Sequence, residues 1–297
     1  MKGLAVIAMV LVAAACQAPT TAQTPVTKAA LVNGTSLAYQ EQGTGLPVVF
    51  VHGGFSDHRV WETQRAAAAS RYRFIALSLR YFGSDPWPDK GETFSQETHI
   101  ADVAAFVREL HAGPVVLVGR SYGAYVATHV ALRHPELVRG LLLNEPTITS
   151  LLDTPEQRAV LAADAREFAP VQDAVRRGDL ESATRLFSDW TNASPGGFDA
   201  LPAQVRRVHL DNARTVPLQI TAARNIALSC AELSRLKMPV SIVKGELGRK
   251  YLKVIAETMH QCVPGSELTT IAAAAHGAPS QQPEAFNRLM LAFLSRY

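Results

Sequence analysis

Residues Gly119-Arg120-Ser121-Tyr122-Gly123 form the stretch of this sequence that decides the fold. An apolar run at residues 114–118 precedes it, and a stretch with helical character, residues 124–133, follows it. A strand, G-x-S-x-G and a helix in this order are typical of a nucleophile elbow, a sharp turn that lifts a serine hydroxyl above a sheet. The glycines are needed because side chains there would collide with the strand or the helix, and the serine must tolerate a strained backbone. The stretch therefore predicts Ser121 as a nucleophile.

The composition is that of a globular protein of ordinary balance. Of the 297 residues, 47% are hydrophobic and 19% are charged, which suits one large α/β domain with an insertion. The formal net charge of +3 is small and the chain has no basic run, so we expect no nucleic-acid partner. The nine histidines lack the spacing of metal ligands, so we expect no metal site.

The N-terminus predicts export. Lys2 is followed by an apolar stretch, residues 4–12, which is too short to span a bilayer as a helix. Three alanines then lead to Cys16, an arrangement that resembles a bacterial lipoprotein box, although Ala13 stands where that box usually carries leucine. We expect a signal peptide at residues 1–15 and a flexible tether at residues 16–29.

Two outcomes of this processing remain open. Lipidation of Cys16 would anchor the protein to the cell envelope, on the periplasmic side or at the cell surface, and would be its only membrane contact. Plain cleavage before Cys16 would leave the protein periplasmic or secreted.

Export also changes how the other two cysteines are interpreted. Cys230 and Cys262 each end a stretch with helical character, just before an apolar segment expected to be a strand. In an oxidising compartment they could form a disulfide, and the alternative is two buried free thiols. Neither cysteine lies beside a base, so we expect no catalytic cysteine.

Strands and helices alternate along most of the chain. Asn33-Gly34 predicts a hairpin turn near the start. We expect strands at residues 30–32, 36–39, 47–51, 72–79, 115–118, 138–143, 240–243 and 268–271. We expect helices at residues 61–70, 98–110, 124–133 and 283–296.

One region, residues 146–237, interrupts this alternation. It shows no strand pattern, and we expect helices at residues 157–168, 171–177, 180–190, 202–213 and 220–226. An insertion between two parallel strands emerges at the sheet edge where ligands bind. We therefore predict a helical cap over the site, between two parts of an α/β core at residues 30–145 and 238–297.

Four features in order resemble the α/β-hydrolase superfamily: His52-Gly53-Gly54 after a strand, the elbow at Ser121, the helical cap, and His276-Gly277 after the last strand. The likeness covers residues 30–297. It implies an α/β-hydrolase fold: a mostly parallel central sheet with helices on both faces and a helical cap insertion. These motifs are specific for the superfamily and not for a substrate.

The resemblance also implies catalytic roles. Ser121 would be the nucleophile and His276 its base, in the chain order of this fold. The acid is usually an aspartate at the position that Gly248 occupies here. Two carboxylates remain as alternatives: Glu145, at a strand end where certain haloalkane dehalogenases carry a glutamate, and Glu246, in a shorter loop.

The oxyanion hole needs two backbone donors. The amide of Tyr122, next to the nucleophile, is one, and by resemblance the amide of Gly54 is the other. We expect His52 to brace that loop. We further expect an aromatic substrate pocket, formed by Phe55, Trp61, Tyr81, Trp87 and Trp190.

The function expected from these features is hydrolysis of a small-molecule carboxylic ester through an acyl-enzyme, without a cofactor. An amide, a lactone or a carbon–carbon bond would suit the same elbow and triad. A non-catalytic, ligand-binding lipoprotein on the same fold is the alternative outside the enzymes.

Overall fold

The computed structural model describes residues 26–221 and 226–297. The expected signal peptide, Cys16 and most of the expected tether lie outside the described residues. Residues 27–29, which were expected in the tether, belong instead to the first strand, which begins at Thr27 and pairs with the second in a hairpin around Asn33 and Gly34. No helix in the described part of the chain is long and apolar enough to cross a membrane.

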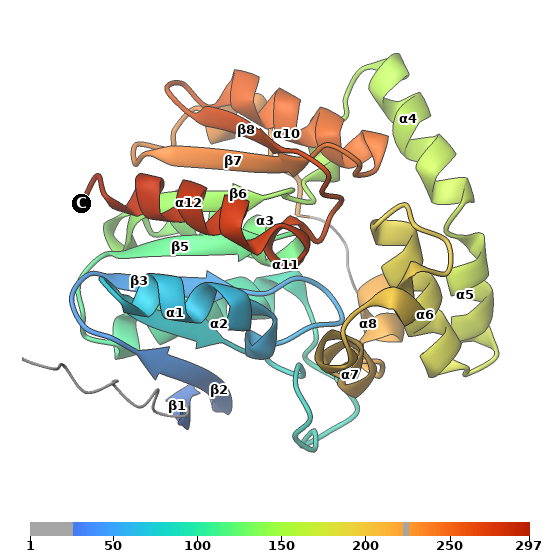
Figure 1. Ribbon diagram of the computed structural model, residues 1–297, viewed down its shortest axis with the longest axis horizontal. Helices are drawn as coiled ribbons and strands as arrows, with labels where there is room; N and C mark the ends of the chain where they lie inside the picture. Colours follow the sequence, from blue (N-terminus) through green and yellow to red (C-terminus); the bar gives the residue numbers. More distant parts are fainter. Residues whose placement is uncertain (1–25, 222–225) are drawn as a thin grey trace, which may run out of the picture.

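A single eight-stranded sheet forms the centre of the molecule (Figure 1). Its strands are β1 (Thr27–Val32), β2 (Thr35–Gln42), β3 (Pro47–Val51), β4 (Arg73–Leu77), β5 (Val115–Arg120), β6 (Val138–Asn144), β7 (Val240–Gly245) and β8 (Glu267–Ile271). Their order across the sheet is β1-β2-β4-β3-β5-β6-β7-β8. Strand β2 runs antiparallel to β1 and β4, and β4, β3, β5, β6, β7 and β8 pair in parallel. The expected strands are all present, with ends displaced by a few residues.

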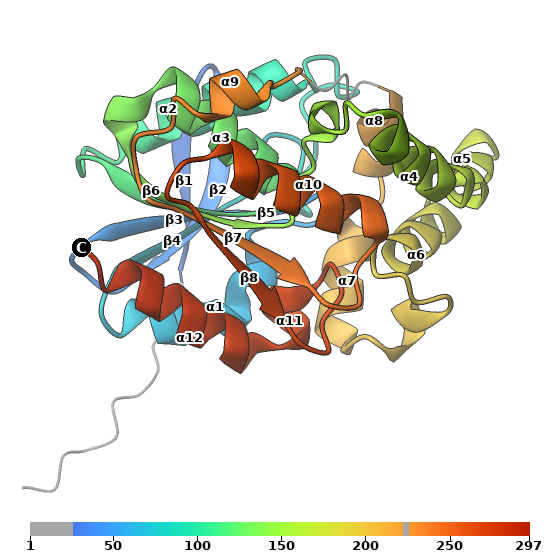
Figure 2. The same cartoon turned by 90° about the horizontal axis from the view of Figure 1, so that it is seen from above.

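Helices cover both faces of the sheet, which is why its central strands are apolar throughout (Figure 2). Every residue of β3 and β5 is buried. One face carries α1 (Glu62–Ala69), α11 (Ala278–Gln281) and α12 (Pro283–Leu294). The other face carries α2 (Gln96–Glu109), α3 (Tyr122–Arg133), α9 (Cys230–Leu233) and α10 (Lys250–Cys262). The mostly parallel, two-faced architecture predicted from the sequence is therefore confirmed.

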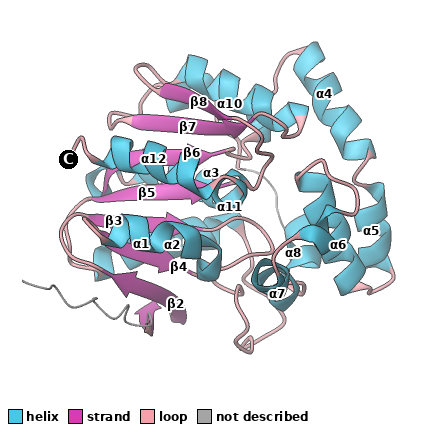
Figure 3. Cartoon of the chain, in the orientation of Figure 1, coloured by secondary structure: helices cyan, strands magenta, loops and turns pink. Residues whose placement is uncertain are grey.

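Between β6 and β7 the chain forms a group of helices beyond the carboxyl ends of the parallel strands, which we call the cap (Figure 3). Its α-helices are α4 (Pro155–Arg166), α5 (Ala169–Arg176), α6 (Leu180–Thr191), α7 (Ala203–Asp211) and α8 (Thr215–Thr221). The expected helix at residues 220–226 overlaps α8 at residues 220 and 221, and residues 222–225 lie outside the described part of the chain. Helix α8 begins earlier than expected, at Thr215, and holds Pro217 in its first turn, where proline is tolerated.

The two limbs of the chain that join the cap to the sheet are linked to each other. The Ser150 hydroxyl donates to the carbonyl of Leu228 and accepts from the amide of the same residue, each at 2.9 Å. Just beyond, Cys230 forms a disulfide with Cys262, one of the two arrangements expected from the sequence. Cys230 begins α9 rather than ending a helix, because Ser229 and Glu232 form a capping box there.

Candidate active site

The turn between β5 and α3 holds Ser121 in a conformation that few residues adopt. Its φ of 55° and ψ of −117° lie in a region that costs a non-glycine residue about 1–3 kcal/mol. The flanking glycines make this turn sterically possible. A Cβ atom at Gly119 would lie 2.6 Å from the Cα of Ala124, and one at Gly123 would overlap the carbonyl oxygen of Val51. The turn thus has the backbone features of a nucleophile elbow, with Ser121 at the carboxyl end of β5.

Glu145 and His276 meet at the carboxyl ends of β6 and β8. His276 follows β8 and is 4% exposed, and Glu145 directly follows β6 and is 0% exposed. The Nδ1 atom of His276 lies 2.6 Å from Oε2 of Glu145. The amide of Gly245 donates to Oε1 of the same carboxylate at 2.9 Å. Because an ionised carboxylate only accepts, Nδ1 carries the proton and Nε2 keeps the lone pair that a general base needs.

A local backbone feature aims the Glu145 side chain. Its φ is 44°, in the left-handed region that a residue of this type rarely adopts. The amide of Glu145 still donates to the carbonyl of Val243 at 2.8 Å, so the chain remains attached to β7 while it turns. Glu145 therefore occupies a strained position at the strand end, as functional residues often do.

The other expected acid, Glu246, does not reach the histidine. Its side chain is exposed, and its Oε2 accepts from the amide of Ala273 at 2.9 Å. Glu246 thus braces the loop that leads to His276. Gly248, where the superfamily usually carries an aspartate, packs beside the carboxylate that takes its place: a Cβ atom there would lie 2.8 Å from Oε1 of Glu145.

The cap also supports the histidine loop. Asn192, the residue after α6, accepts at Oδ1 from the amide of Gly277 at 3.0 Å and from Nε2 of Gln281 at 3.1 Å. From the core, the Asn144 side chain donates to the carbonyl of His276 at 3.2 Å. The position of His276 therefore depends on the core and on the cap.

Gly54 and Tyr122, the residues expected to supply the oxyanion hole, both line the cavity that Ser121 and His276 line. Tyr122 is the first residue of α3, where N–H groups have no partner within the helix and the helix dipole favours negative charge. His52 braces the loop of Gly54: its Nδ1 lies 2.7 Å from the carbonyl of Gly53, and its Nε2 accepts from the amide of Leu79 at 3.0 Å. Burial lowers the pKa of His52 to about 4, so its ring stays neutral.

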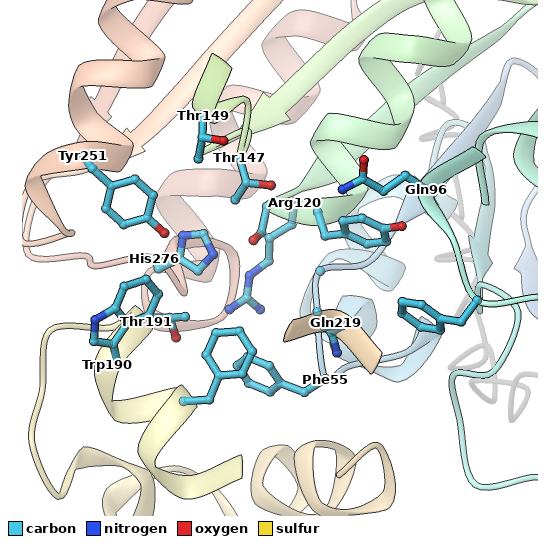
Figure 4. A pocket seen from close by; sticks show the side chains of 16 residues that line it. Phe55, Gln96, Arg120, Thr147, Thr149, Trp190, Thr191, Gln219, Tyr251 and His276 are labelled. Carbon is cyan, nitrogen blue, oxygen red and sulfur yellow. The ribbon is translucent and has the colours of Figure 1, made fainter. Parts of the chain in front are cut away.

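The cavity has a volume of about 180 Å³ and lies between the sheet edge and the cap (Figure 4). It is lined by Gly53, Gly54, Phe55, Phe94, Gln96, Arg120, Ser121, Tyr122, Thr147, Thr149, Phe187, Trp190, Thr191, Gln219, Tyr251 and His276. A second cavity of about 360 Å³ shares several of these residues and extends among apolar side chains of the cap, such as Leu161 and Phe168. Space for an apolar substrate group thus adjoins the polar centre.

Of the five aromatic residues expected in the pocket, only Phe55 and Trp190 line it. Trp61 is fully buried between β3 and the helices on one face of the sheet, against Phe50 and Phe286. Tyr81 and Trp87 pack edge to face against each other and line a separate small cavity of about 80 Å³. The hydroxyl of Tyr81 bonds to Asp89 at 3.0 Å and lies 2.7 Å from the hydroxyl of Thr93, both in the same loop, and neither ring lines the main cavity.

The structure also adds cavity residues that the sequence did not single out. Arg120 occupies a variable position of the elbow, and being next to Ser121 was the only signal for it. Gln219 comes from the cap, and its Oε1 lies so near Gly54 that a Cβ atom at Gly54 would overlap it. No group of three or more histidine, cysteine or acidic side chains among the described residues is arranged to hold a metal ion.

Comparison with known proteins agrees with this geometry. The sequence model of the family described as alpha/beta hydrolase fold matches residues 47–220. The chain belongs to the α/β-hydrolase fold family. This assignment covers the elbow, the loop of Gly54 and most of the cap.

Relatives of this α/β hydrolase have varied activities. It is 28% identical over 281 residues to BpoC of Mycobacterium tuberculosis, a protein assigned to the non-heme bromoperoxidases, with 88% of this chain and 98% of BpoC covered. Its fold is similar to that of an esterase from Thermogutta terrifontis, with a TM-score of 0.70, 22% identity and coverage of 92% and 98% of the two chains. The carboxylesterase CesB of Bacillus subtilis gives a TM-score of 0.72 at 19% identity, with 92% of each chain covered.

Proposed function

We propose that this α/β hydrolase cleaves carboxylic esters through an acyl-enzyme formed on Ser121. The observation that carries the proposal is the 2.6 Å contact between Nδ1 of His276 and Oε2 of the buried Glu145. This contact leaves Nε2 of His276 as a base in the cavity that Ser121 also lines. The esterases among the solved structures of this fold agree with the proposal.

The first half of the reaction forms the acyl-enzyme. Nε2 of His276 takes the Ser121 proton while Oγ attacks the ester carbonyl carbon. The amides of Tyr122 and Gly54 stabilise the negative charge that develops on the carbonyl oxygen. Glu145 stabilises the imidazolium, which then gives its proton to the departing alcohol as the carbon–oxygen bond of the ester breaks.

The second half releases the acid. Nε2 of His276 takes a proton from water, and the resulting hydroxide attacks the acyl carbon. The imidazolium returns the proton to Oγ of Ser121 as the acyl bond breaks, which leaves a carboxylic acid product and restores the enzyme. Phe187, Trp190 and Gln219 of the cap line the cavity opposite the sheet edge and limit the access of bulk water to these steps.

A fluorophosphonate probe tests the proposal, because it reacts covalently only with an activated serine. We expect rapid stoichiometric labelling of the wild type, none of Ser121→Ala, and strongly slowed labelling of His276→Ala. Labelling of the wild type no faster than that of Ser121→Ala would overturn the proposal and favour a binding protein on the same fold. Turnover of a panel of aryl esters, amides and lactones then ranks the acyl substrates.

A further inference from the structure

The cavity contains a buried positive charge that the described residues leave without a partner. Arg120 is 8% exposed and lines the cavity, yet no described residue forms a hydrogen bond or an ion pair with its guanidinium. Arg249 shows the usual arrangement for a buried arginine: it is 9% exposed, and its Nη1 donates to Asp164 at 2.6 Å and to Glu167 at 2.8 Å. An isolated buried charge is costly, so its retention in a site calls for a functional explanation.

No acid in the described part of the chain forms an ion pair with Arg120. Glu145 is the charged group that acts on it through space, but the oxygens of that carboxylate already accept from His276 and from the amide of Gly245. Burial lowers the pKa of Arg120 to about 10, which still leaves the guanidinium protonated at neutral pH. The N–H donors of this charged guanidinium, which no described residue occupies, can therefore bind an anion inside the cavity.

The side chain of Arg120 extends into the cavity itself. In the view of Figure 4 its guanidinium projects between His276 and Gln219, and Thr191 and Phe55 line the same cavity. Because Arg120 precedes Ser121 in the chain, their Cα atoms are about 3.8 Å apart. An anion on the guanidinium would thus lie within about one arginine side chain of the reacting carbon.

A neutral ester has no group that matches a guanidinium, whereas a planar carboxylate accepts two parallel hydrogen bonds from it. We propose that Arg120 selects esters that carry a second, free carboxylate close to the scissile bond, as in half-esters of dicarboxylic acids. This inference rests on the proposed ester hydrolysis. The apolar remainder of such a substrate fits the adjoining cavity beside Phe168 and Leu161.

Two esters that differ only in this charge provide the test. Monomethyl glutarate and dimethyl glutarate have the same chain, and methanol release measures both, counted per ester bond. We expect wild type to prefer the monoester in kcat/KM. In Arg120→Gln, we expect this preference to fall by about tenfold to a hundredfold, the range for a hydrogen bond to a charged group. Arg120→Lys, which keeps the charge but not the fork, should retain part of the preference.

Arg214→Gln is the matched control. It removes one positive charge from an arginine that stacks on Trp87 and donates to the carbonyl of Gly83, outside the cavity lining. We expect this variant to keep the wild-type preference. An equal loss in Arg214→Gln would assign the effect to the overall field of the protein and would overturn the proposal.

Other outcomes also decide the matter. Equal losses on both esters in Arg120→Gln would place the guanidinium on the transition-state oxyanion, and a wild-type preference for the diester would exclude anion selection; either result overturns the proposal.

Binding of glutarate measured by calorimetry, tight in wild type and weakened in Arg120→Gln, tests the anion site without turnover. Failure of fluorophosphonate labelling would refute the ester hydrolase, whereas absence of glutarate binding would refute only the role of Arg120.

Discussion

Moving the triad acid from Glu145 to position 248 tests the catalytic geometry directly. Glu145→Ala removes the only carboxylate within hydrogen-bond distance of His276 among the described residues. Loss of the acid of a serine–histidine–acid triad lowers kcat by about 10⁴-fold. We expect a loss of this size, measured by ester turnover and by the rate of fluorophosphonate labelling.

Gly248→Asp alone should also be harmful. The new Cβ atom would lie 2.8 Å from Oε1 of Glu145 and 3.6 Å from Oε2, and hydrogen bonds hold that carboxylate in place. Overpacking of this kind costs about 1–3 kcal/mol, and a second carboxylate beside Glu145 adds repulsion between like charges. We expect lower thermal stability together with lower activity.

The double variant Glu145→Ala/Gly248→Asp should recover part of what each change removes. Deleting the glutamate side chain removes the collision, and the φ of Gly248 lies outside the left-handed region, so an aspartate meets no backbone strain there. A carboxylate oxygen lies roughly 2.4 Å from its Cβ by standard bond lengths, so it reaches close to the site of Oε2 and hence to Nδ1 of His276. We expect at least about tenfold more activity than in Glu145→Ala.

Two results would refute this reasoning. Glu145→Ala with near wild-type turnover would show that another group stabilises the imidazolium. A double variant that folds, by circular dichroism and thermal melting, but is no faster than Glu145→Ala would show that the two positions are not equivalent for catalysis. Glu246→Gln is the matched control. It should keep its activity, because the carbonyl oxygen of the glutamine side chain can still accept from the amide of Ala273.

Three further predictions concern stability. Arg249→Met, which leaves a buried carboxylate without its partner, should lower the free energy of unfolding by about 3–5 kcal/mol; an unchanged melting temperature would contradict this. Burial lowers the pKa of His52 to about 4 and of His99 to about 3. The unfolded chain therefore binds protons that the fold does not as pH falls from about 6.5 to 4. Denaturant titrations should show stability falling by about 1.4 kcal/mol per pH unit for each histidine, and a flat profile over this range would refute it. Reduction of Cys230–Cys262, whose sequence separation is 32 residues, should cost about 3–4 kcal/mol, and equal denaturation midpoints with and without reductant would refute this.

The sequence was sufficient for the sheet because burial on both faces leaves a simple pattern. The strands β3 and β5 are short apolar runs, and along the chain helices alternate with the parallel strands. From the sequence we expected this part of the cap to be helical at residues 220–226, whereas α8 begins at Thr215 and accommodates Pro217 in its first turn, where a proline disrupts no hydrogen bond.

The site was harder to predict than the fold. Glu145 and Glu246 both follow strand ends, and only the backbone shows that Glu145 turns inward with a φ of 44°. The sequence could not show which aromatic residues near the sheet edge line the cavity, because it does not determine the direction in which a loop folds. Trp61 accordingly belongs to the core. The sequence could not show that Arg120 is buried without a partner, because both properties depend on residues far along the chain.

The linked limbs below the cap have a consequence for the history of such enzymes. Strands β6 and β7 pair directly, Ser150 holds Leu228 where the chain leaves and returns, and a disulfide fixes the returning limb to α10. The two ends of the insertion are thus fixed in position, so its interior can be exchanged or lengthened without disturbing the sheet. An exchanged insertion would still have to keep the contacts by which the cap holds the core, among them Asn192 on the histidine loop and Asp164 on Arg249.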